Sequence, residues 1–160
     1  RGIARTFTGE ITSAVESALP FALTDGQRLA IEDIRTDLAA TNRMSRLLQG
    51  DVGSGKTVVA LMAMAAVAES GAQSALMSPT EILATQHYRT LAPICVKVGI
   101  GIELLTGKMP AGDRRAALER LESGESSIAV WVSKDEFFVY SVDLATGKAR
   151  WGNPMVFRRC

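Results

Sequence analysis

Hydrophobic and polar positions follow a helical period in two long stretches of the chain. Apolar residues recur three and four positions apart over 25–40, which predicts a helix with one buried face. Over 56–70 nearly every position is apolar, which is typical of a helix covered on all sides. Thr24 with Gln27 matches the capping box that begins a helix, and Gly71 stands where the second helix would end.

Shorter apolar runs predict strands, with further helices between them. Strands are expected at 46–49, 74–78, 100–107 and 127–132. Helices are expected from Pro79–Thr80 onward and over 111–124. Strands that alternate with helices of about 10–15 residues are typical of βαβ units. The sequence therefore predicts an α/β fold, with a parallel sheet flanked by helices.

The strength of these patterns divides the chain into three segments. Residues 1–19 show weak periodicity and are interpreted as a lead-in or linker that ends at Pro20. Residues 20–130 carry the alternation of strands and helices. In 131–160, two β-type runs flank the letters Ala-Thr-Gly-Lys, which predicts a β-hairpin tail with Gly147 in its turn.

Composition adds few constraints on function. The 160 residues carry a net charge of +1, so a nucleic-acid contact would depend on locally placed Lys and Arg. Cys95 and Cys160 have no disulfide or zinc spacing, and His87 is the single histidine. The richest apolar run has about 12 residues, whereas a bilayer span needs about 20. We therefore expect a cytoplasmic protein with no membrane contact, and we take it as a monomer.

The letters at 50–57, Gly-Asp-Val-Gly-Ser-Gly-Lys-Thr, match the phosphate-loop pattern G-x-x-x-x-G-K-[ST] in full. Its glycines allow backbone N–H groups to turn inward around a phosphate, and the helix that follows adds its N-terminal amides. Lys56 would reach the β- and γ-phosphates of ATP, and the Thr57 hydroxyl would bind Mg²⁺. We expect Lys56 and Thr57 to be the catalytic residues. The predicted nucleotide-binding residues of the loop are Gly50, Asp51, Val52, Gly53, Ser54, Gly55, Lys56 and Thr57.

The segments around this loop narrow the class of nucleotide-binding protein. The letters "LPFALTDGQ" precede it, and "SALMSPTEILATQHY" and "LLTGK" follow it in that order. Together with "MSRLLQGDVGSGKTVVALMA", they resemble the motifs of superfamily 2 helicases, most of all the RecG-type ATP-dependent DNA helicases. The resemblance covers about Leu19 to Val130. It implies an incomplete RecA-like P-loop NTPase lobe, from an enzyme of DNA repair and recombination that uses ATP and Mg²⁺ to unwind or remodel branched DNA.

The resemblance also implies roles for single residues. Gln27 matches the glutamine that contacts adenine, in the same segment as Phe21 and Leu23. Two other segments match turns that run beside the DNA backbone, where a helix beginning at Thr80 would offer free amides to a phosphate. The implied DNA-binding residues are Pro79, Thr80, Glu81, Gln86, Thr106 and Gly107, with His87 and Leu105 in the same segments.

Several of these residues also have a purely structural interpretation. Gln27 can close the capping box with Thr24, with or without an adenine contact. Glu81 can serve only the dipole of its helix, and His87 can be a surface or packing residue. The arginines of 111–124 can lie on a solvated helix face or touch DNA.

The resemblance ends near Val130. RecG-type helicases continue with an acidic motif that holds Mg²⁺ and activates water, and here only the pair Asp135-Glu136 and Asp143 offer weak candidates. We find no match to the second ATPase lobe or its arginine finger, and we interpret 131–160 as a foreign, truncated or misread segment. We therefore expect the isolated chain to hydrolyse ATP very slowly or not at all. The alternative is a non-catalytic nucleotide-binding module whose hairpin binds a partner protein.

Overall fold

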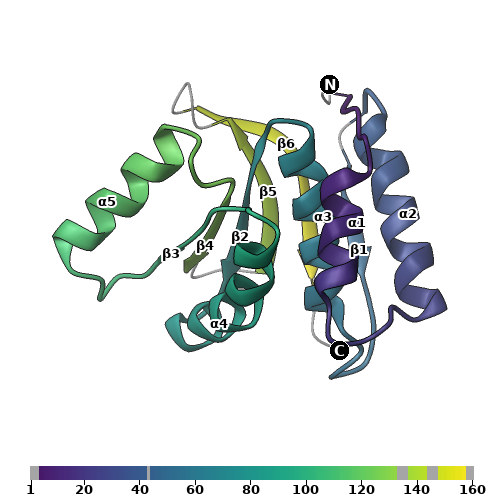
Figure 1. Ribbon diagram of the computed structural model, residues 1–160, viewed down its shortest axis with the longest axis horizontal. Helices are drawn as coiled ribbons and strands as arrows, with labels where there is room; N and C mark the ends of the chain where they lie inside the picture. Colours follow the sequence, from purple (N-terminus) through teal and green to yellow (C-terminus); the bar gives the residue numbers. More distant parts are fainter. Residues whose placement is uncertain (1–3, 43, 133–136, 144–147, 158–160) are drawn as a thin grey trace.

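The computed structural model describes residues 4–42, 44–132, 137–143 and 148–157. A central sheet carries helices on both faces (Figure 1). The helices are α1 (Glu10–Ala18), α2 (Asp25–Ala39), α3 (Lys56–Glu69), α4 (Glu81–Lys97) and α5 (Ala111–Glu122). The strands are β1 (Arg46–Leu48), β2 (Gln73–Ser78), β3 (Ile102–Leu105), β4 (Ile128–Val132), β5 (Phe137–Asp143) and β6 (Lys148–Phe157).

The strands form one sheet in the order β1-β6-β5-β2-β4-β3. Strand β4 pairs in parallel with both β2 and β3, and β1 pairs in parallel with β6. Of the strands in the described ranges, only β5 runs the opposite way, antiparallel to both of its neighbours. The carboxyl ends of β1, β2 and β3 therefore meet at one edge of the sheet. The predicted α/β fold is confirmed. Strands β5 and β6 pair antiparallel, as in the predicted hairpin, but they lie within the sheet, and the predicted turn at Gly147 lies outside the described residues.

Helix α3 is the centre of the larger core. Its residues 58–67 are all buried, as its unbroken apolar pattern predicts, and Leu61 and Met64 are fully covered. The amphipathic helices α1 and α2 pack against it, so that α3 lies between them and the sheet (Figure 1). Helix α5 covers the other face, where Ala117 and Leu121 pack on Leu105 and Ala129. Two apolar layers thus fix the sheet that positions the candidate site.

The helix-end signals in the sequence act as predicted. In the capping box of α2, the Thr24 side chain accepts from the Gln27 amide, and the Gln27 side chain accepts from the Thr24 amide. Gly71 follows α3 with a left-handed φ of 73°, which a glycine adopts without steric strain. Cys95 is fully buried in α4, and burial raises the pKa of its thiol to about 11. This cysteine is a core residue, as its apolar neighbours suggest.

Helix α1 lies in the segment that the sequence analysis interpreted only as a lead-in. Val15 is fully buried against the core, which the weak periodicity of this segment did not indicate. The Ile11 amide donates to Glu69 Oε1 at 2.7 Å, so the last residue of α3 holds the first turn of α1. Residues 10–18 are therefore a packed part of the fold. The boundary of a domain near Pro20 stays a prediction.

The described helices include none with the length and apolarity that crossing a bilayer requires.

One polar cluster ties β3 to α5. Glu103 is largely buried, and its two carboxylate oxygens accept hydrogen bonds from Arg120 Nε at 2.7 Å and Nη2 at 2.9 Å. The buried hydroxyl of Ser126 donates to Glu103 Oε1 at 2.7 Å. The hydrogen bonds from Arg120, and then from Ser126, lower the pKa of Glu103 in spite of its burial.

Replacing Glu103 by glutamine is expected to lower the free energy of unfolding by about 1–2 kcal/mol at pH 7, because charge-assisted hydrogen bonds are lost. A lowered folded-state pKa stabilises the fold only while the carboxyl is ionised. That stabilisation disappears as the pH falls from the ordinary value of 4.5 through the lowered pKa. Urea unfolding of the parent and Glu103→Gln chains should therefore differ at pH 7 and converge in acid. An equal difference at both pH values would contradict this account.

Candidate nucleotide and DNA site

The predicted phosphate loop, residues 50–57, connects the carboxyl end of β1 to the first turn of α3. Gly53 and Gly55 have left-handed φ values of 83° and 78°, where other residues would be strained. Gly55 is the N-cap of α3, and the Ser54 amide donates to the Asp51 carbonyl at 3.1 Å. This tight turn presents the amides of the α3 N-terminus to the space in front of the loop. An N-terminus of this kind favours an anion.

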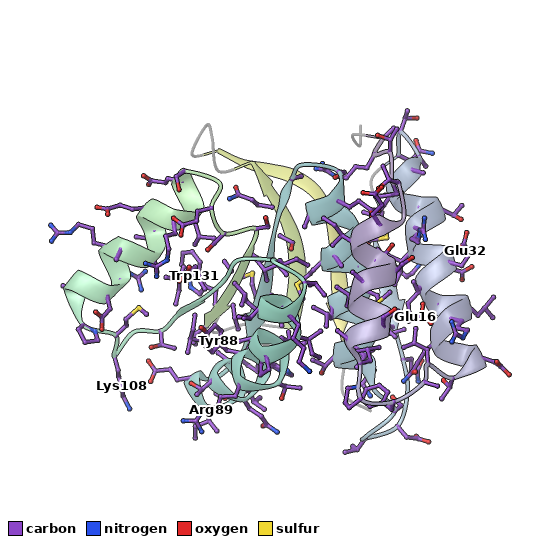
Figure 2. The ribbon with its side chains drawn as sticks, viewed as in Figure 1. Glu16, Glu32, Tyr88, Arg89, Lys108 and Trp131 are labelled. Carbon is purple, nitrogen blue, oxygen red and sulfur yellow. The ribbon has the colours of Figure 1, made fainter. Side chains whose placement is uncertain are left out.

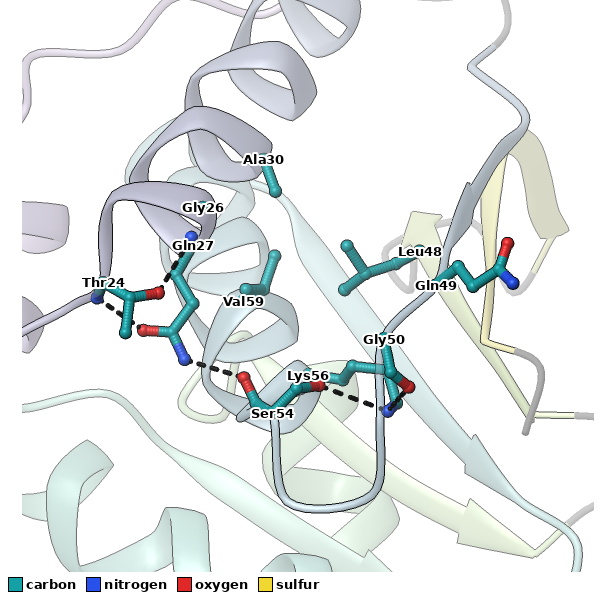
Figure 3. A pocket seen from close by; sticks show the side chains of 10 residues that line it. All are labelled: Thr24, Gly26, Gln27, Ala30, Leu48, Gln49, Gly50, Ser54, Lys56 and Val59. Carbon is teal, nitrogen blue, oxygen red and sulfur yellow. Dashed lines mark hydrogen bonds between the residues drawn. The ribbon is translucent and has the colours of Figure 1, made fainter. Parts of the chain in front are cut away.

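The Lys56 ammonium lies inside its own loop. Its Nζ donates to the carbonyl of Gly50 at 2.5 Å, to the carbonyl of Asp51 at 2.8 Å and to Ser54 Oγ at 3.3 Å. Figure 3 shows the side chain bridging the two arms of the loop. These acceptors are neutral, whereas a phosphate would offer charged oxygens and stronger hydrogen bonds. The position therefore suits a cation that would turn to a bound phosphate.

Gln27 links the capping box to this loop. Its Oε1 accepts from the Thr24 amide at 2.9 Å, while its Nε2 donates to the Ser54 carbonyl at 2.9 Å. The approach is so close that a Cβ at Gly55 would collide with Gln27 Nε2. The left-handed backbone of Gly55 favours glycine, and a side chain at this position would also displace the Gln27 amide. Gln27 therefore closes the capping box, as its structural interpretation predicts, and its side chain also joins α2 to the loop.

A pocket of about 240 Å³ opens between α2, the loop and α3 (Figure 3). Its lining combines apolar side chains with amide and ammonium groups, as is usual for sites that bind a base and a phosphate. The lining residues are Thr24, Gly26, Gln27, Ala30, Leu48, Gln49, Gly50, Ser54, Lys56 and Val59. The sequence-predicted Gln27, Gly50, Ser54 and Lys56 are thus brought together. Asp51, Val52 and Gly53 lie at the exposed tip of the loop.

The two roles of Gln27 can be separated by Gln27→Glu. A glutamate still accepts from the Thr24 amide, so the capping box and the thermal stability should be kept. It has no N–H group for the Ser54 carbonyl, and a charged oxygen would lie against that carbonyl. We expect the affinity for MgATP, measured by calorimetry, to fall by about 2- to 12-fold. Equal MgATP affinity in both chains would show that the bond to Ser54 does not support the site.

The two predicted DNA segments also meet at this edge of the sheet. Glu81 follows the carboxyl end of β2, and Gly107 follows that of β3. A Cβ at Gly107 would lie 3.1 Å from Glu81 Oε1, and Lys108 Nζ lies 3.7 Å from Glu81 Oε2. The Thr80 hydroxyl accepts from the Leu83 amide at 3.2 Å and caps α4. Glu81 therefore stands in the first turn of α4 and also lies beside the second segment.

The outer face of α4 carries a groove of about 550 Å³. Two rows of side chains four residues apart line it, namely Glu81, Thr85 and Arg89, and Ile82, Gln86 and Thr90. Of these six residues, Glu81 and Gln86 are among the DNA-binding residues expected from sequence, and the i, i+4 spacing is the signal that could have identified the others. His87 is absent from this lining and half-buried, and its burial lowers the pKa of the imidazole. This agrees with a packing role for His87.

The register of β5 argues against Asp143 as the missing acidic group. Phe137 pairs with Phe157, which pairs with Leu48 just before the loop. Asp143 lies six residues further along β5, about 20 Å from that edge. It therefore stands at the opposite edge of the sheet, because β5 is antiparallel. The other candidate pair, Asp135-Glu136, lies outside the described residues. Within the described ranges, no group of three or more His, Cys, Asp and Glu residues is placed to hold a metal.

Comparison with known proteins agrees with the motif order. The family model "DEAD/DEAH box helicase" matches residues 24–143, which extends past Val130 into β5. The chain is 44% identical over 129 residues to the ATP-dependent DNA helicase RecG of Streptococcus pneumoniae, covering 81% of this chain and 19% of that protein. It is 45% identical over 130 residues to RecG of Bacillus subtilis, which again covers 81% of this chain and 19% of that protein.

A solved structure described as RecG bound to a three-way DNA junction superposes with a TM-score of 0.76 at 39% identity. The superposition covers 82% of this chain and 18% of that one. The chain thus spans about a fifth of the length of these relatives. The family match and the sheet with its flanking helices lead to one assignment. The chain belongs to the DEAD/DEAH box helicase family, and its matched region is similar to RecG ATP-dependent DNA helicases.

Proposed function

We propose that this chain forms the ATP-holding and DNA-contacting part of the first motor lobe of a RecG-type helicase. In the full-length helicase, ATP hydrolysis would be coupled to unwinding or remodelling of branched DNA. The observation that carries the proposal is the shared edge of the sheet, where the phosphate loop and both DNA segments follow β1, β2 and β3. The relative bound to a three-way junction supports the choice of branched DNA.

At the nucleotide site, the chain would supply backbone amides that bind the ATP phosphates and the positive charge of Lys56. The 14-residue helix α3 and its left-handed N-cap suit the ATP phosphates, and Gln27 fixes the loop beside the pocket. Lys56 would exchange its loop carbonyls for phosphate oxygens and stabilise charge on the transferring group. Magnesium would be held by the Thr57 hydroxyl together with the phosphates, and when bound it neutralises phosphate charge.

On the DNA side, the contacts would position a strand without reading its sequence. Amides at the N-terminus of α4 and the turn at Thr106-Gly107 face the same edge and suit phosphate oxygens. Glu81 alone would repel a phosphate, but Lys108 beside it is 90% exposed in its side chain and offsets this charge. Polar side chains of the α4 groove would extend the contact with the DNA strand along about two turns of the helix.

The isolated chain is expected to bind MgATP yet turn it over very slowly. Asp143 lies at the wrong edge of the sheet to activate water beside the loop. We expect steady-state phosphate release, measured with forked DNA present, to stay far below the roughly 1 s⁻¹ at the low end of ordinary enzymes. Turnover of about 1 s⁻¹ that is lost in Lys56→Ala would contradict the proposal, because it would show that the chain has an acidic group able to activate water.

A second candidate function is a nucleotide-binding module without catalysis, with the β5–β6 pair as an interaction element. The distance of Asp143 from the loop favours it, since it leaves binding without hydrolysis. The two candidates differ in DNA affinity, which only the helicase lobe requires. A cytoplasmic, monomeric protein remains the expectation under both.

A further inference from the structure

We propose that Trp131 and Arg114 form a stacking site for one unpaired base of the DNA strand at the carboxyl edge of the sheet. This inference rests on the proposed DNA-contacting function of that edge and adds a site outside the matched motifs. The partner is single-stranded DNA, or the unpaired strand at a junction, because stacking within a duplex covers both faces of a base.

Trp131 is an exception within its strand. Ile128, Ala129 and Val130 of β4 are buried, whereas Trp131 is 43% exposed. Alternation along the strand places it on the same face as Ala129, which packs beneath α5. Figure 2 shows the ring beside α5, near the carboxyl end of the strand. An indole at such a position can offer a flat apolar surface to an incoming ring.

Arg114 connects this ring to the predicted phosphate-contacting turn. Its guanidinium carbon lies 5.9 Å from the centroid of the Trp131 ring, and its Nη1 donates to the Thr106 carbonyl at 3.3 Å. Strand pairing places Leu105, the residue before Thr106, directly opposite Trp131. A cation, an aromatic ring and a backbone-contacting turn therefore lie together.

This combination is the one that single-stranded DNA requires. Cationic groups follow the phosphates while aromatic rings stack on the bases, which is independent of base identity. With Thr106-Gly107 and Lys108 beside the backbone, a base turned toward α5 would meet Trp131. A rival role is packing: Trp131 could cover apolar surface of a longer chain, and this role predicts no loss of DNA affinity when the ring is removed.

The test measures fluorescence anisotropy of a labelled oligothymidine of about 12 nucleotides with the full 160-residue chain. Trp131→Ala and Trp131→Leu should each weaken binding by about 5- to 150-fold, because one stacked base is lost. Trp131→Phe should retain most of the affinity. Leucine keeps apolar volume without a π face, which covers the case in which the alanine chain fails to fold. Leu29→Ala, at a 68% exposed position on α2, is the matched control.

An abasic strand of the same length separates base stacking from phosphate contacts. The parent and Trp131→Leu chains should bind it with equal, weaker affinity. Equal binding of oligothymidine by the parent and Trp131→Leu chains would overturn the stacking site and leave the helicase proposal intact. No binding of oligothymidine or forked DNA by the parent chain would overturn both.

Discussion

Lys56→Ala is expected to lower the affinity for MgATP by about 10- to 150-fold, the value of one or more charge-assisted hydrogen bonds. The Lys56 ammonium is already held between the two arms of the loop by the carbonyls of Gly50 and Asp51. A bound phosphate replaces these neutral acceptors by charged ones. The lysine therefore forms stronger hydrogen bonds in the nucleotide complex than in the free chain, and this difference stabilises the complex. Isothermal calorimetry with MgATP measures this directly.

The matched control for this prediction is Lys108→Ala. Lys108 carries the same charge at the same edge of the sheet, but it pairs with Glu81 and lies outside the nucleotide pocket. Its replacement should leave MgATP affinity unchanged and weaken only DNA binding. If both lysines affect MgATP equally, the effect is a general field of positive charge, and the assignment of the loop to the phosphates is wrong.

Removal of residues 133–160 is expected to abolish cooperative folding. Among the described strands, β1 pairs only with β6, and β5 joins β6 to β2. Without these two strands, β1 and the loop behind it lose their connection to the rest of the sheet. The backbone hydrogen bonds of three strand interfaces disappear at about 0.5–1.5 kcal/mol each, against a total stability of about 5–15 kcal/mol. Thermal unfolding followed by circular dichroism should show no sharp transition.

A chain that ends after Phe157 is the control, because it keeps β6 entire. It should unfold at the midpoint of the parent. A chain ending at Val132 that unfolds cooperatively at the same midpoint would show that 133–160 is an independent appendage. That outcome would favour the alternative in which the tail serves only a partner protein.

Local chemistry explains what the sequence could predict. The capping box of Thr24 and Gln27, the helix end at Gly71 and the loop at 50–57 each depend on residues close in the chain. Their backbone conformations follow mainly from the residues present, although the loop also accepts one long-range hydrogen bond, from Gln27 Nε2 to the Ser54 carbonyl. The apolar length of α3 likewise required burial on all sides. The local structure of the predicted nucleotide-binding loop was therefore available from sequence.

The features that sequence analysis missed depend on long-range contacts. Helix α1 is held by Val15 in the core and by Glu69 at its first turn, 58 residues away from Ile11. The place of β5 and β6 inside the sheet, between β2 and β1, is set by pairing with distant strands, which no pattern within either strand specifies. The contact of Arg114 with Trp131 joins α5 to β4 in the same way.

The joint placement of ATP and DNA at one edge of the sheet can be tested by the affinity of the chain for a forked DNA duplex across a range of salt concentrations, with MgATP present. We expect binding that weakens steeply as salt rises, because phosphate contacts at the shared edge release counterions. Replacement of Gln86, in the groove of α4, should weaken it further. Saturable MgATP binding with no affinity for forked DNA at low salt would contradict the account and favour the nucleotide-binding module.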